Sequence, residues 1–259
     1  MSAGHSAPRL EIIGITGIPE VRTGVRLGQE IARACAAQGT PVAGGDVVVV
    51  TQKIVSKAEG QVVSLSDVEP TKFALDFAAA SGRDPRLIEL ILMESRSIVR
   101  TDPARGILIA ETRHGFVCAN AGIDTSNVPG DEMVSLLPED PDQSARRILD
   151  ELRDAAAGVD AAVVISDTFG RAWREGHVNF AIGMAGIEPF KDYRGTLDAV
   201  GKVMGVTRIA DVDELAAAAE LVMAKVAGIP VALIRGHRFT RGDQGYGALV
   251  RPRSGDLFR

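Results

Sequence analysis

Short β-branched runs, spaced between longer segments with helical periodicity, constrain the fold of this chain more than any other feature. Such runs are typical of strands, and apolar residues three and four apart are typical of helices. The predicted strands are Glu11–Ile15, Asp46–Thr51, Gly106–Ala110, Phe116–Ala119, Ala161–Ser166 and Pro230–Ile234. The predicted helices are Leu27–Ala37, Thr71–Ser81, Pro85–Glu94, Gln143–Ala156 and Val212–Ala227. Because the two types do not alternate regularly, the sequence favours a mixed α+β fold over a doubly wound sheet.

The residues between these elements predict a helix cap, three loops and a connection between lobes. Asp211, followed by Glu214, predicts the N-terminal cap of the last helix. Three polar segments without regular pattern are expected to be loops that can carry chemistry: Asn120–Asp131, Asp167–Asn179 and Gly236–Gly247. The region Asp124–Pro141 contains Pro and Gly, and it is where we expect the chain to pass between lobes.

Length and charge narrow the class of protein. The 259 residues, 46% of them hydrophobic, suffice for one large domain or two closely packed lobes. We expect residues 11–247 to form the functional domain, with a flexible N-terminal tail at 1–10 and a C-terminal tail at 248–259. The net charge is −5 and the basic residues are scattered, which argues against a nucleic-acid or membrane surface.

Targeting and redox signals agree with a cytoplasmic protein. The apolar runs are too short to span a membrane, and the first eight residues lack the pattern of a signal peptide. Cys35 and Cys118 have no spacing that indicates a disulfide framework or a zinc site. Two free thiols are consistent with a reducing compartment.

Several familiar sites are absent from the sequence. It contains no P-loop, no dinucleotide-binding Gly motif, no His-Glu-x-x-His and no Gly-x-Ser-x-Gly. Its four histidines are far apart along the chain, and none forms a ligand pair. A nucleotide, if one binds, must be held by other means.

Two aspartates are the strongest candidates for a metal site. Asp167 follows an apolar strand and precedes a Gly-containing segment, and Asp124 lies in a Gly-flanked polar turn. Carboxylates from two segments can hold Mg²⁺ or Mn²⁺ and leave positions open for phosphate oxygens. The alternative is structural: Asp124 makes an Asx turn and Asp167 caps a helix.

A second candidate is the segment from Thr51 to Gly60, which carries Lys53 and Lys57 after a predicted strand. Lysine is a common point-charge partner of phosphate. The alternative is a pair of solvated lysines on a strand pair.

A third candidate combines arginines with aromatic residues. Arg171, Arg174 and Arg194 lie near Trp173 and Tyr193 in sequence, a combination that suits an anionic ligand with a ring system. The pattern is also common on ordinary surfaces, and Glu20 is uninformative by itself.

Taken together, these segments resemble the coenzyme F420-0:gamma-glutamyl ligase family, from about Gly14 to Gly236. The resemblance is carried by ordered blocks in this sequence: Gly17–Glu20, Gly45–Thr51, Lys53–Gly60, Glu94–Arg96, His114–Asp124, Leu137–Pro141, Ser166–Arg171, Asp192–Gly195 and Asp213–Ala216. It implies a family-specific α+β fold of two packed lobes, seen as an interlocked homodimer. It also implies an enzyme that uses GTP, Mn²⁺ or Mg²⁺, and K⁺ to join L-glutamate to the lactyl carboxylate of F420-0. Relatives often add further γ-linked glutamates.

The resemblance also implies roles for particular positions. The expected metal ligands are Asp124 and Asp167 for one ion and Thr168 for a second. Asp124, Asp167 and Lys57 are the expected catalytic residues. From the arginine–aromatic pattern above, Arg171, Trp173 and Arg194 are the candidates for binding the acidic coenzyme. The expected nucleotide contacts are Ile18, Pro19, Glu20, Val21, Gln52, Lys57, Asn127, Met223, Ala224, Lys225, Val226, Ala227 and Gly228.

The chain departs from the family pattern at two positions. Relatives commonly have serine where this chain has Gln52, and some place a glutamine ligand where it has Lys225. A lysine ammonium has no lone pair for a metal. The second metal is therefore held differently here, or Lys225 contacts phosphate directly.

The mechanism implied is attack of the precursor carboxylate on the GTP γ-phosphate, followed by attack of the glutamate amine on the resulting acyl phosphate. No covalent protein nucleophile is expected. Two alternatives stay open: a carboxylate–amine ligase for a different acid, and a non-catalytic nucleotide-binding protein that kept the fold.

Overall fold

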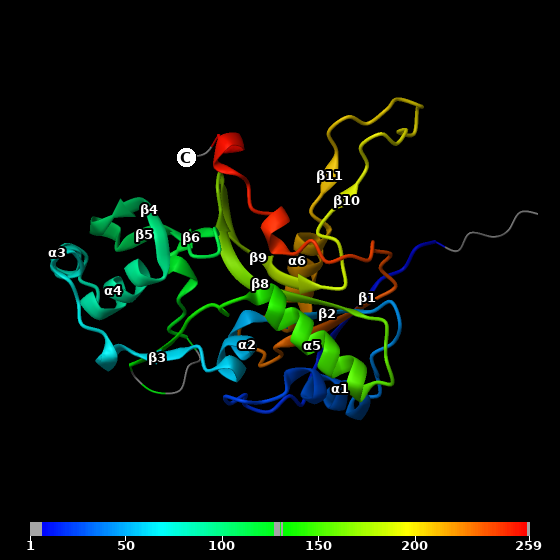
Figure 1. Cartoon of the computed structure of the whole chain (residues 1–259), viewed down its shortest axis with the longest axis horizontal. Helices are drawn as coiled ribbons and strands as arrows, with labels where there is room; N and C mark the ends of the chain where they lie inside the picture. The colour runs from blue at the N-terminus through cyan, green and yellow to red at the C-terminus, as the bar shows by residue number, and fades with distance from the viewer. Residues whose placement is uncertain (1–6, 127–129, 131, 258–259) are drawn as a thin grey trace, which may run out of the picture.

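The computed structural model describes residues 7–126, 130 and 132–257, which form two lobes (Figure 1). The larger lobe contains a five-stranded sheet in the order β1-β12-β2-β8-β9. The strands are β1 (Glu11–Ile15), β2 (Val47–Thr51), β8 (Ala162–Arg171), β9 (Arg174–Ala185) and β12 (Val231–Arg235). β2 and β8 are parallel, whereas β12 runs antiparallel to both β1 and β2, and β9 antiparallel to β8. β1, β2 and β8 therefore all point the same way.

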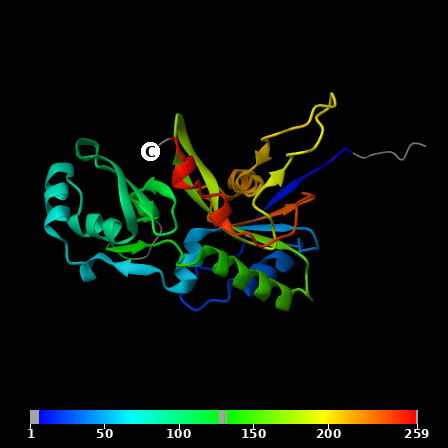
Figure 2. The ribbon, with the colours of Figure 1, turned by 45° about the horizontal axis from the view of Figure 1, so that its top comes forward.

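Helices cover both faces of this sheet (Figure 2). Helices α1 (Leu27–Ala37) and α5 (Pro141–Ala155) pack on one face, and α6 (Asp211–Met223) packs on the other. In the run 47–50, Val48 and Val50 join the core under α1 and α5, whereas Val47 and Val49 join the core under α6. A strand buried on both faces reads as a continuous apolar run, which is what the sequence has here.

Two glycines allow α5 to approach its neighbours closely. A Cβ on Gly28 of α1 would lie 2.4 Å from the carbonyl oxygen of Ile148, and one on Gly183 of β9 would lie 2.4 Å from that of Pro141. Neither distance is possible for a real side chain, so the larger residue would have to push α5 away.

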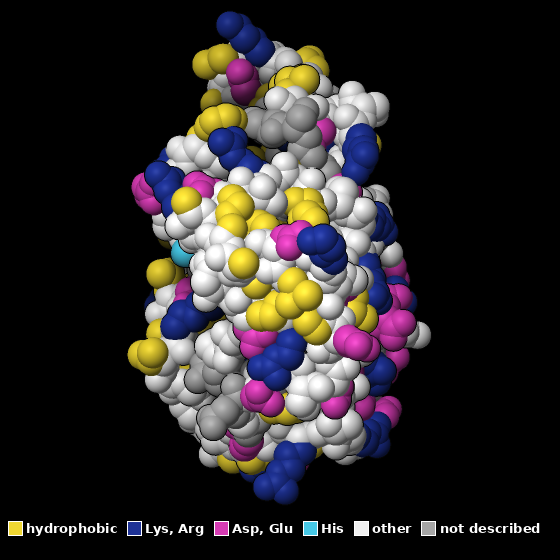
Figure 3. All heavy atoms as spheres, turned by 90° about the vertical axis from the view of Figure 1, so that its left-hand side faces the viewer, with side chains coloured by type: hydrophobic (Ala, Val, Ile, Leu, Met, Phe, Trp, Pro, Cys, Tyr) yellow, Lys and Arg dark blue, Asp and Glu magenta, His cyan; other side chains and the backbone are white. Residues whose placement is uncertain are grey.

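The smaller lobe comprises the described residues between 62 and 135 and has its own hydrophobic core. Its elements are β3 (Val62–Ser64), α3 (Lys72–Ser81), α4 (Pro85–Met93), β4 (Ser95–Asp102), β5 (Ile107–Thr112), β6 (Val117–Ala119) and β7 (Met133–Ser135). The chain leaves the larger lobe through β3 and returns through its antiparallel partner β7. The side of the molecule formed by this lobe shows apolar patches divided by charged side chains (Figure 3).

Two further segments extend from the larger lobe. A hairpin arm contains β10 (Lys191–Asp192) and β11 (Arg208–Ile209) and projects from the body (Figure 1). The segment after residue 247 contacts the smaller lobe, where Arg253 forms a 2.8 Å ion pair with Glu111 of β5.

All six predicted strands and all five predicted helices are present, most of them within two residues of the expected bounds. The mixed α/β class is confirmed. Pairing of β7 with β3 agrees with the expectation that the chain passes between lobes within residues 124–141, but the outward crossing at β3 was not predicted.

Four expectations about local structure are wrong. The segment from Asp167 to Asn179 is not a loop but most of the β8–β9 hairpin. The segment from Gln52 to Glu59 is helix α2, not part of a strand pair. Helix α6 ends at Met223 rather than Ala227, because Ala224 has a positive φ of 43°. Asp211 does not cap α6: the cap position is Ala210, and Asp211 accepts a 2.8 Å hydrogen bond from His237.

Two findings bear on the class of protein. No helix in the described part of the chain is long and apolar enough to cross a membrane. Cys35 and Cys118 are both free and buried. The prediction for the first six residues of the N-terminal tail lies outside the described residues.

Candidate functional site

One edge of the larger sheet gathers the ends of several strands. β1 and β2 end at this edge, where Thr51 of β2 lies in register with Ser166 of β8, and β8 continues beyond the edge to Arg171. β12 begins at the same edge, because its first residue, Val231, pairs with Val50 of β2 and with Ile15 of β1. Segments that are far apart in sequence, such as Ile15 and Val231, therefore meet here, as is common where parallel strands end.

A cavity of about 560 Å³ lies at this edge. It is lined by most of the residues expected at the nucleotide and the metal: Ile18, Pro19, Glu20, Val21, Gln52, Lys57, Asp124, Asp167, Thr168, Met223, Ala224, Lys225, Val226 and Gly228. A volume of this size suits a small-molecule ligand. The structure thus brings together residues that the sequence places in five separate segments.

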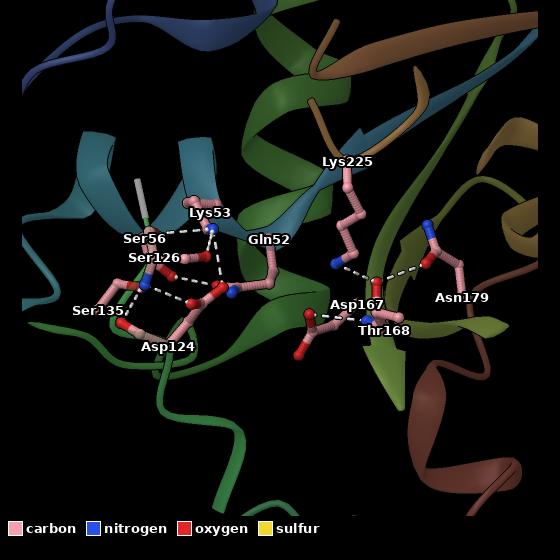
Figure 4. A network of polar contacts seen from close by, with 10 residues as sticks. All are labelled: Gln52, Lys53, Ser56, Asp124, Ser126, Ser135, Asp167, Thr168, Asn179 and Lys225. Atoms are coloured by element: carbon pink, nitrogen blue, oxygen red, sulfur yellow. Dashed lines mark hydrogen bonds and ion pairs between the residues drawn. The ribbon is translucent and has the colours of Figure 1, made fainter. Parts of the chain in front are cut away.

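Asp124 forms the first of two polar groups in the cavity (Figure 4). Its Oδ2 is 2.8 Å from the ammonium of Lys53, which also donates to the backbone oxygen and hydroxyl of Ser126. Its Oδ1 accepts a 2.7 Å hydrogen bond from the backbone N–H of Ser126, which is the Asx turn considered above. Burial by itself raises the pKa of Asp124, but the hydrogen bonds from Lys53 and Ser126 outweigh it and hold the pKa below its ordinary value.

Asp167 belongs to the second group, on the β8 side of the cavity (Figure 4). In the described part of the chain, the backbone N–H of Thr168, 2.8 Å away, is the one hydrogen-bond donor to this carboxylate. Burial raises the pKa of Asp167 to about 7, and the Thr168 N–H and the charge of Lys225 offset this only in part. Asp167 lies within strand β8, so the alternative that it caps a helix is wrong.

Thr168 connects Asp167 to a chain of hydrogen bonds. Its hydroxyl accepts from Lys225 at 2.7 Å and lies 2.6 Å from the amide oxygen of Asn179, to which it donates. The amide nitrogen of Asn179 donates to Glu220 of α6 at 3.1 Å.

Helix α2 brings further polar side chains to the cavity. Its residues Gln52, Ser56 and Lys57 are buried, and the hydroxyl of Ser56 donates to the amide oxygen of Gln52 at 2.9 Å. Lys57 forms a 2.5 Å ion pair with Glu20, which lies in the segment following β1. Lys53 and Lys57 are four residues apart, so both lie on the same side of the helix.

The donor atoms around Asp124 and Asp167 fit one hard divalent cation. The carboxylates of Asp124 and Asp167 and the hydroxyl of Ser166 offer oxygen ligands of the kind that Mg²⁺ and Mn²⁺ prefer. The Asp167 carboxylate has no cation in contact with it among the described residues, and the buried Ser166 hydroxyl in the cavity wall has no hydrogen-bond partner among them. The described residues contain no cluster of three or more His, Cys, Asp or Glu side chains that could hold a metal unaided. Remaining ligands would have to come from water or from a bound phosphate.

Some predicted residues lie elsewhere. Arg171 and Trp173 are at the end of the β8–β9 hairpin, and Arg194 is on the β10–β11 arm, where it pairs with Asp192 at 2.5 Å. None of the three lines the cavity, and neither does Ala227. The expected grouping of these arginines beside aromatic residues is thus split between two hairpins. Asn127 lies outside the described residues.

Several residues of the site were not among the predicted ones. These are Ser126, Ser166, Asn179 and Glu220. Lys53, which the sequence analysis named with Lys57 as a candidate phosphate partner, also lines the cavity. No local signal indicates Asn179, which reaches Thr168 only through the register of the β8–β9 hairpin.

A second cavity of about 690 Å³ lies between the N-terminal end of α1, the last residues of α2 and the first half of α5. Although it is larger, none of the predicted site residues lines it. Its basic side chains, Arg26 and Arg147, are paired with Glu151 and Glu59. We therefore assign the site to the cavity at the sheet edge.

Comparison with known proteins gives one consistent result. The family model for F420-0:gamma-glutamyl ligase matches residues 16–236. The Coenzyme F420:L-glutamate ligase of Methanothermobacter thermautotrophicus is 46% identical over 253 residues, which is 96% of this chain and 99% of that protein. The enzymes of the same name from Methanopyrus kandleri and Methanocaldococcus jannaschii are 44% and 37% identical, over 91% and 97% of this chain and 93% and 97% of their own lengths. With a match over most of its length and relatives that it covers almost completely, the chain belongs to the F420-0:gamma-glutamyl ligase family.

Proposed function

We propose that this protein joins L-glutamate to the lactyl carboxylate of coenzyme F420-0 with consumption of GTP and release of GDP and phosphate. Family membership supports the reaction. The observation that supports this site is the cavity at the sheet edge. Asp124 and Asp167 line it together with three lysines, Lys53, Lys57 and Lys225. Such a set of groups suits the transfer of a phosphoryl group, for which the protein must mainly position reactants and stabilise charge.

In this proposal the nucleotide lies along one half of the cavity. Residues 18–21, Gln52 and residues 223–226 and 228 form that half. Lys57 is mostly buried and fixed by Glu20, so its ammonium is held in place before a ligand arrives. A pre-positioned charge loses little side-chain entropy when it contacts phosphate.

Asp124 and Asp167 would hold one Mn²⁺ or Mg²⁺, which when bound neutralises charge on the phosphate oxygens. Asp167 has to lose a proton before it can act as a ligand, because burial raises its pKa to about 7. Asp124 is already ionised and shares its carboxylate with Lys53. Lys53 thereby keeps the turn around Ser126 next to α2.

The proposed chemistry has two steps. The carboxylate of the precursor attacks the γ-phosphorus of GTP, the bond to the β–γ bridging oxygen breaks, and GDP leaves. The glutamate amine then attacks the acyl phosphate, phosphate leaves, and the amine loses a proton. Further γ-linked glutamates would be added by the same steps on the new γ-carboxylate. The proposal includes activation by K⁺, a homodimer and a cytoplasmic location, none of which depends on the geometry of the cavity.

Mass spectrometry of the purified protein with F420-0, L-glutamate, GTP and Mn²⁺ tests the proposal. A product heavier by one or more glutamyl units, formed together with GDP, would establish the reaction and count the additions. GTP consumption with another acid but not with F420-0 would point to a ligase for that acid. Absence of GTP consumption with every acceptor would support a non-catalytic nucleotide-binding protein.

A further inference from the structure

The second metal position implied by the family resemblance does not fit the residues that this structure brings together. That position centres on the hydroxyl of Thr168, but here the ammonium of Lys225 donates to this hydroxyl at 2.7 Å. An ammonium has three donors and no lone pair, so it cannot ligate a metal.

The hydrogen bonds of Thr168 leave little room for a cation. Its proton is directed at the amide oxygen of Asn179, 2.6 Å away, and one of its two lone pairs accepts from Lys225. A divalent cation on the remaining lone pair would lie close to the Lys225 ammonium, and the two positive charges would repel each other.

The surroundings of Lys225 favour its positive charge at this place. Donors point in one direction along the chain of contacts, from Lys225 to Thr168, from Thr168 to Asn179, and from Asn179 to the carboxylate of Glu220. Aligned hydrogen bonds that end on a carboxylate polarise one another and stabilise the cation at the other end.

The backbone before Lys225 also has an unusual conformation. Helix α6 ends at Met223, and Ala224 follows with φ 43° and ψ 138°, a combination that is costly for a residue with a Cβ. This turn stops the helix so that Lys225, the next residue, reaches the wall formed by β8 and β9 (Figure 4).

We propose that the Lys225 ammonium takes the place of a second divalent cation, so that each site of this protein holds one divalent ion and one lysine charge at the phosphates. The inference rests on the proposed function, because it assumes a nucleotide phosphate in the cavity. It assigns to Lys225 the neutralisation of phosphate charge that a second ion would otherwise supply.

Native mass spectrometry with Mn²⁺ and a non-hydrolysable GTP analogue tests this by counting ions per chain in the nucleotide complex. The wild-type protein is expected to hold one Mn²⁺. Lys225→Gln, which replaces the ammonium by an amide oxygen that can ligate, is expected to hold two. Lys225→Arg keeps the charge and is expected to stay at one, as is Lys202→Gln, a matched change at an exposed lysine on the β10–β11 arm.

Two Mn²⁺ ions in the wild-type complex would overturn the inference and leave the proposed function standing. A single ion in Lys225→Gln, with nucleotide bound as in the wild type, would also overturn it, since removing the lysine would not have opened a site. A nucleotide complex without Mn²⁺ in any of the proteins would overturn the proposed metal site itself, and the inference with it.

Discussion

Two aspartates line the same cavity in opposite electrostatic states. Asp124, in the turn contributed by the smaller lobe, is paired with Lys53 and has a lowered pKa. Asp167, on strand β8 of the larger lobe, has one backbone donor among the described residues and a pKa raised to about 7. The difference lies in what surrounds each carboxylate, because the residue type is the same and both are partly buried.

This difference indicates separate contributions to one proposed metal site. The paired aspartate is ionised at any pH near neutrality, and its lysine ties the two lobes together. The unpaired aspartate is held at a cost to stability, and a cation would relieve that cost. A residue that is destabilising without its ligand is a better indication of function than one that is satisfied within the fold.

The largest expected effect is on turnover. Asp167→Asn and Asp124→Asn are each expected to lower kcat by about three orders of magnitude or more, because each removes a charged ligand from the cation that stabilises the phosphates. The measurement is GDP formation at limiting Mn²⁺, with circular dichroism as the check that both variants are folded. Wild-type turnover in both variants would show that neither aspartate is a ligand of a catalytic metal, and the two aspartates would then differ only in their effect on stability.

Lys57 tests whether a lysine that is already ion-paired still binds phosphate. Lys57→Ala is expected to raise the KM for GTP by about 10- to 100-fold, because a charge-assisted contact is lost. Glu20→Gln is the matched control, since it removes the partner of Lys57 and leaves the lysine. If Lys57→Ala leaves both KM and kcat unchanged, Lys57 serves only to hold Glu20.

The two aspartates should have opposite effects on the stability of the metal-free protein. Asp167 has a folded pKa above its unfolded value, so its contribution is fully present below about pH 4 and is lost as pH rises toward 7. Asp167→Asn should therefore gain on the order of 2 kcal/mol relative to wild type between pH 5 and pH 8. Urea unfolding at the two pH values measures this gain.

Asp124 has a lowered folded pKa, so its contribution is present above the unfolded pKa and is lost as pH falls through the lower folded value. Asp124→Asn should cost about 1 kcal/mol at pH 8, because Lys53 loses a partly screened partner. The same sign of change for both variants at pH 8 would contradict the comparison.

Metal affinity should also depend on pH through one aspartate only. Below pH 7, Mn²⁺ has to displace a proton from Asp167, so its apparent affinity should fall about tenfold per pH unit. Titrations followed by electron paramagnetic resonance between pH 5.5 and 8 measure this slope. The Asp124→Asn variant should bind Mn²⁺ more weakly but keep the same dependence of affinity on pH. If that dependence vanished in this variant, the displaced proton would belong to Asp124 and not to Asp167.

The smallest effects are expected at residues outside the cavity. Alanine at Arg171, Trp173 or Arg194 should raise the KM for F420-0 by only a few-fold, while the KM for GTP stays unchanged, because these residues do not line the cavity. Kinetics with each substrate varied separately make the distinction. A loss of GTP affinity in any of the three would place the nucleotide elsewhere.

Local pattern was enough to predict most of the larger sheet and its helices. Strands such as 47–51 and helices such as 27–37 bury continuous or periodic apolar residues, and such patterns are visible in a single sequence. Helix α2 was missed because the side chains that it buries toward the cavity include Gln52, Ser56 and Lys57. The outer half of β8 and the first half of β9 were missed because their polar, largely exposed residues resemble a loop.

The candidate site, too, was predicted from the sequence only in part. The sequence by itself determined the strands, the faces of the core and, through family resemblance, Asp124, Asp167 and Lys57 as site residues. Only the tertiary structure decided that Lys53 pairs with Asp124, that Lys225 donates to Thr168 across 57 residues of chain, and that Asp167 has no cation in contact among the described residues. Burial of apolar residues follows from local spacing, whereas the charge state of a carboxylate depends on which distant segments the fold brings within a few ångströms of it.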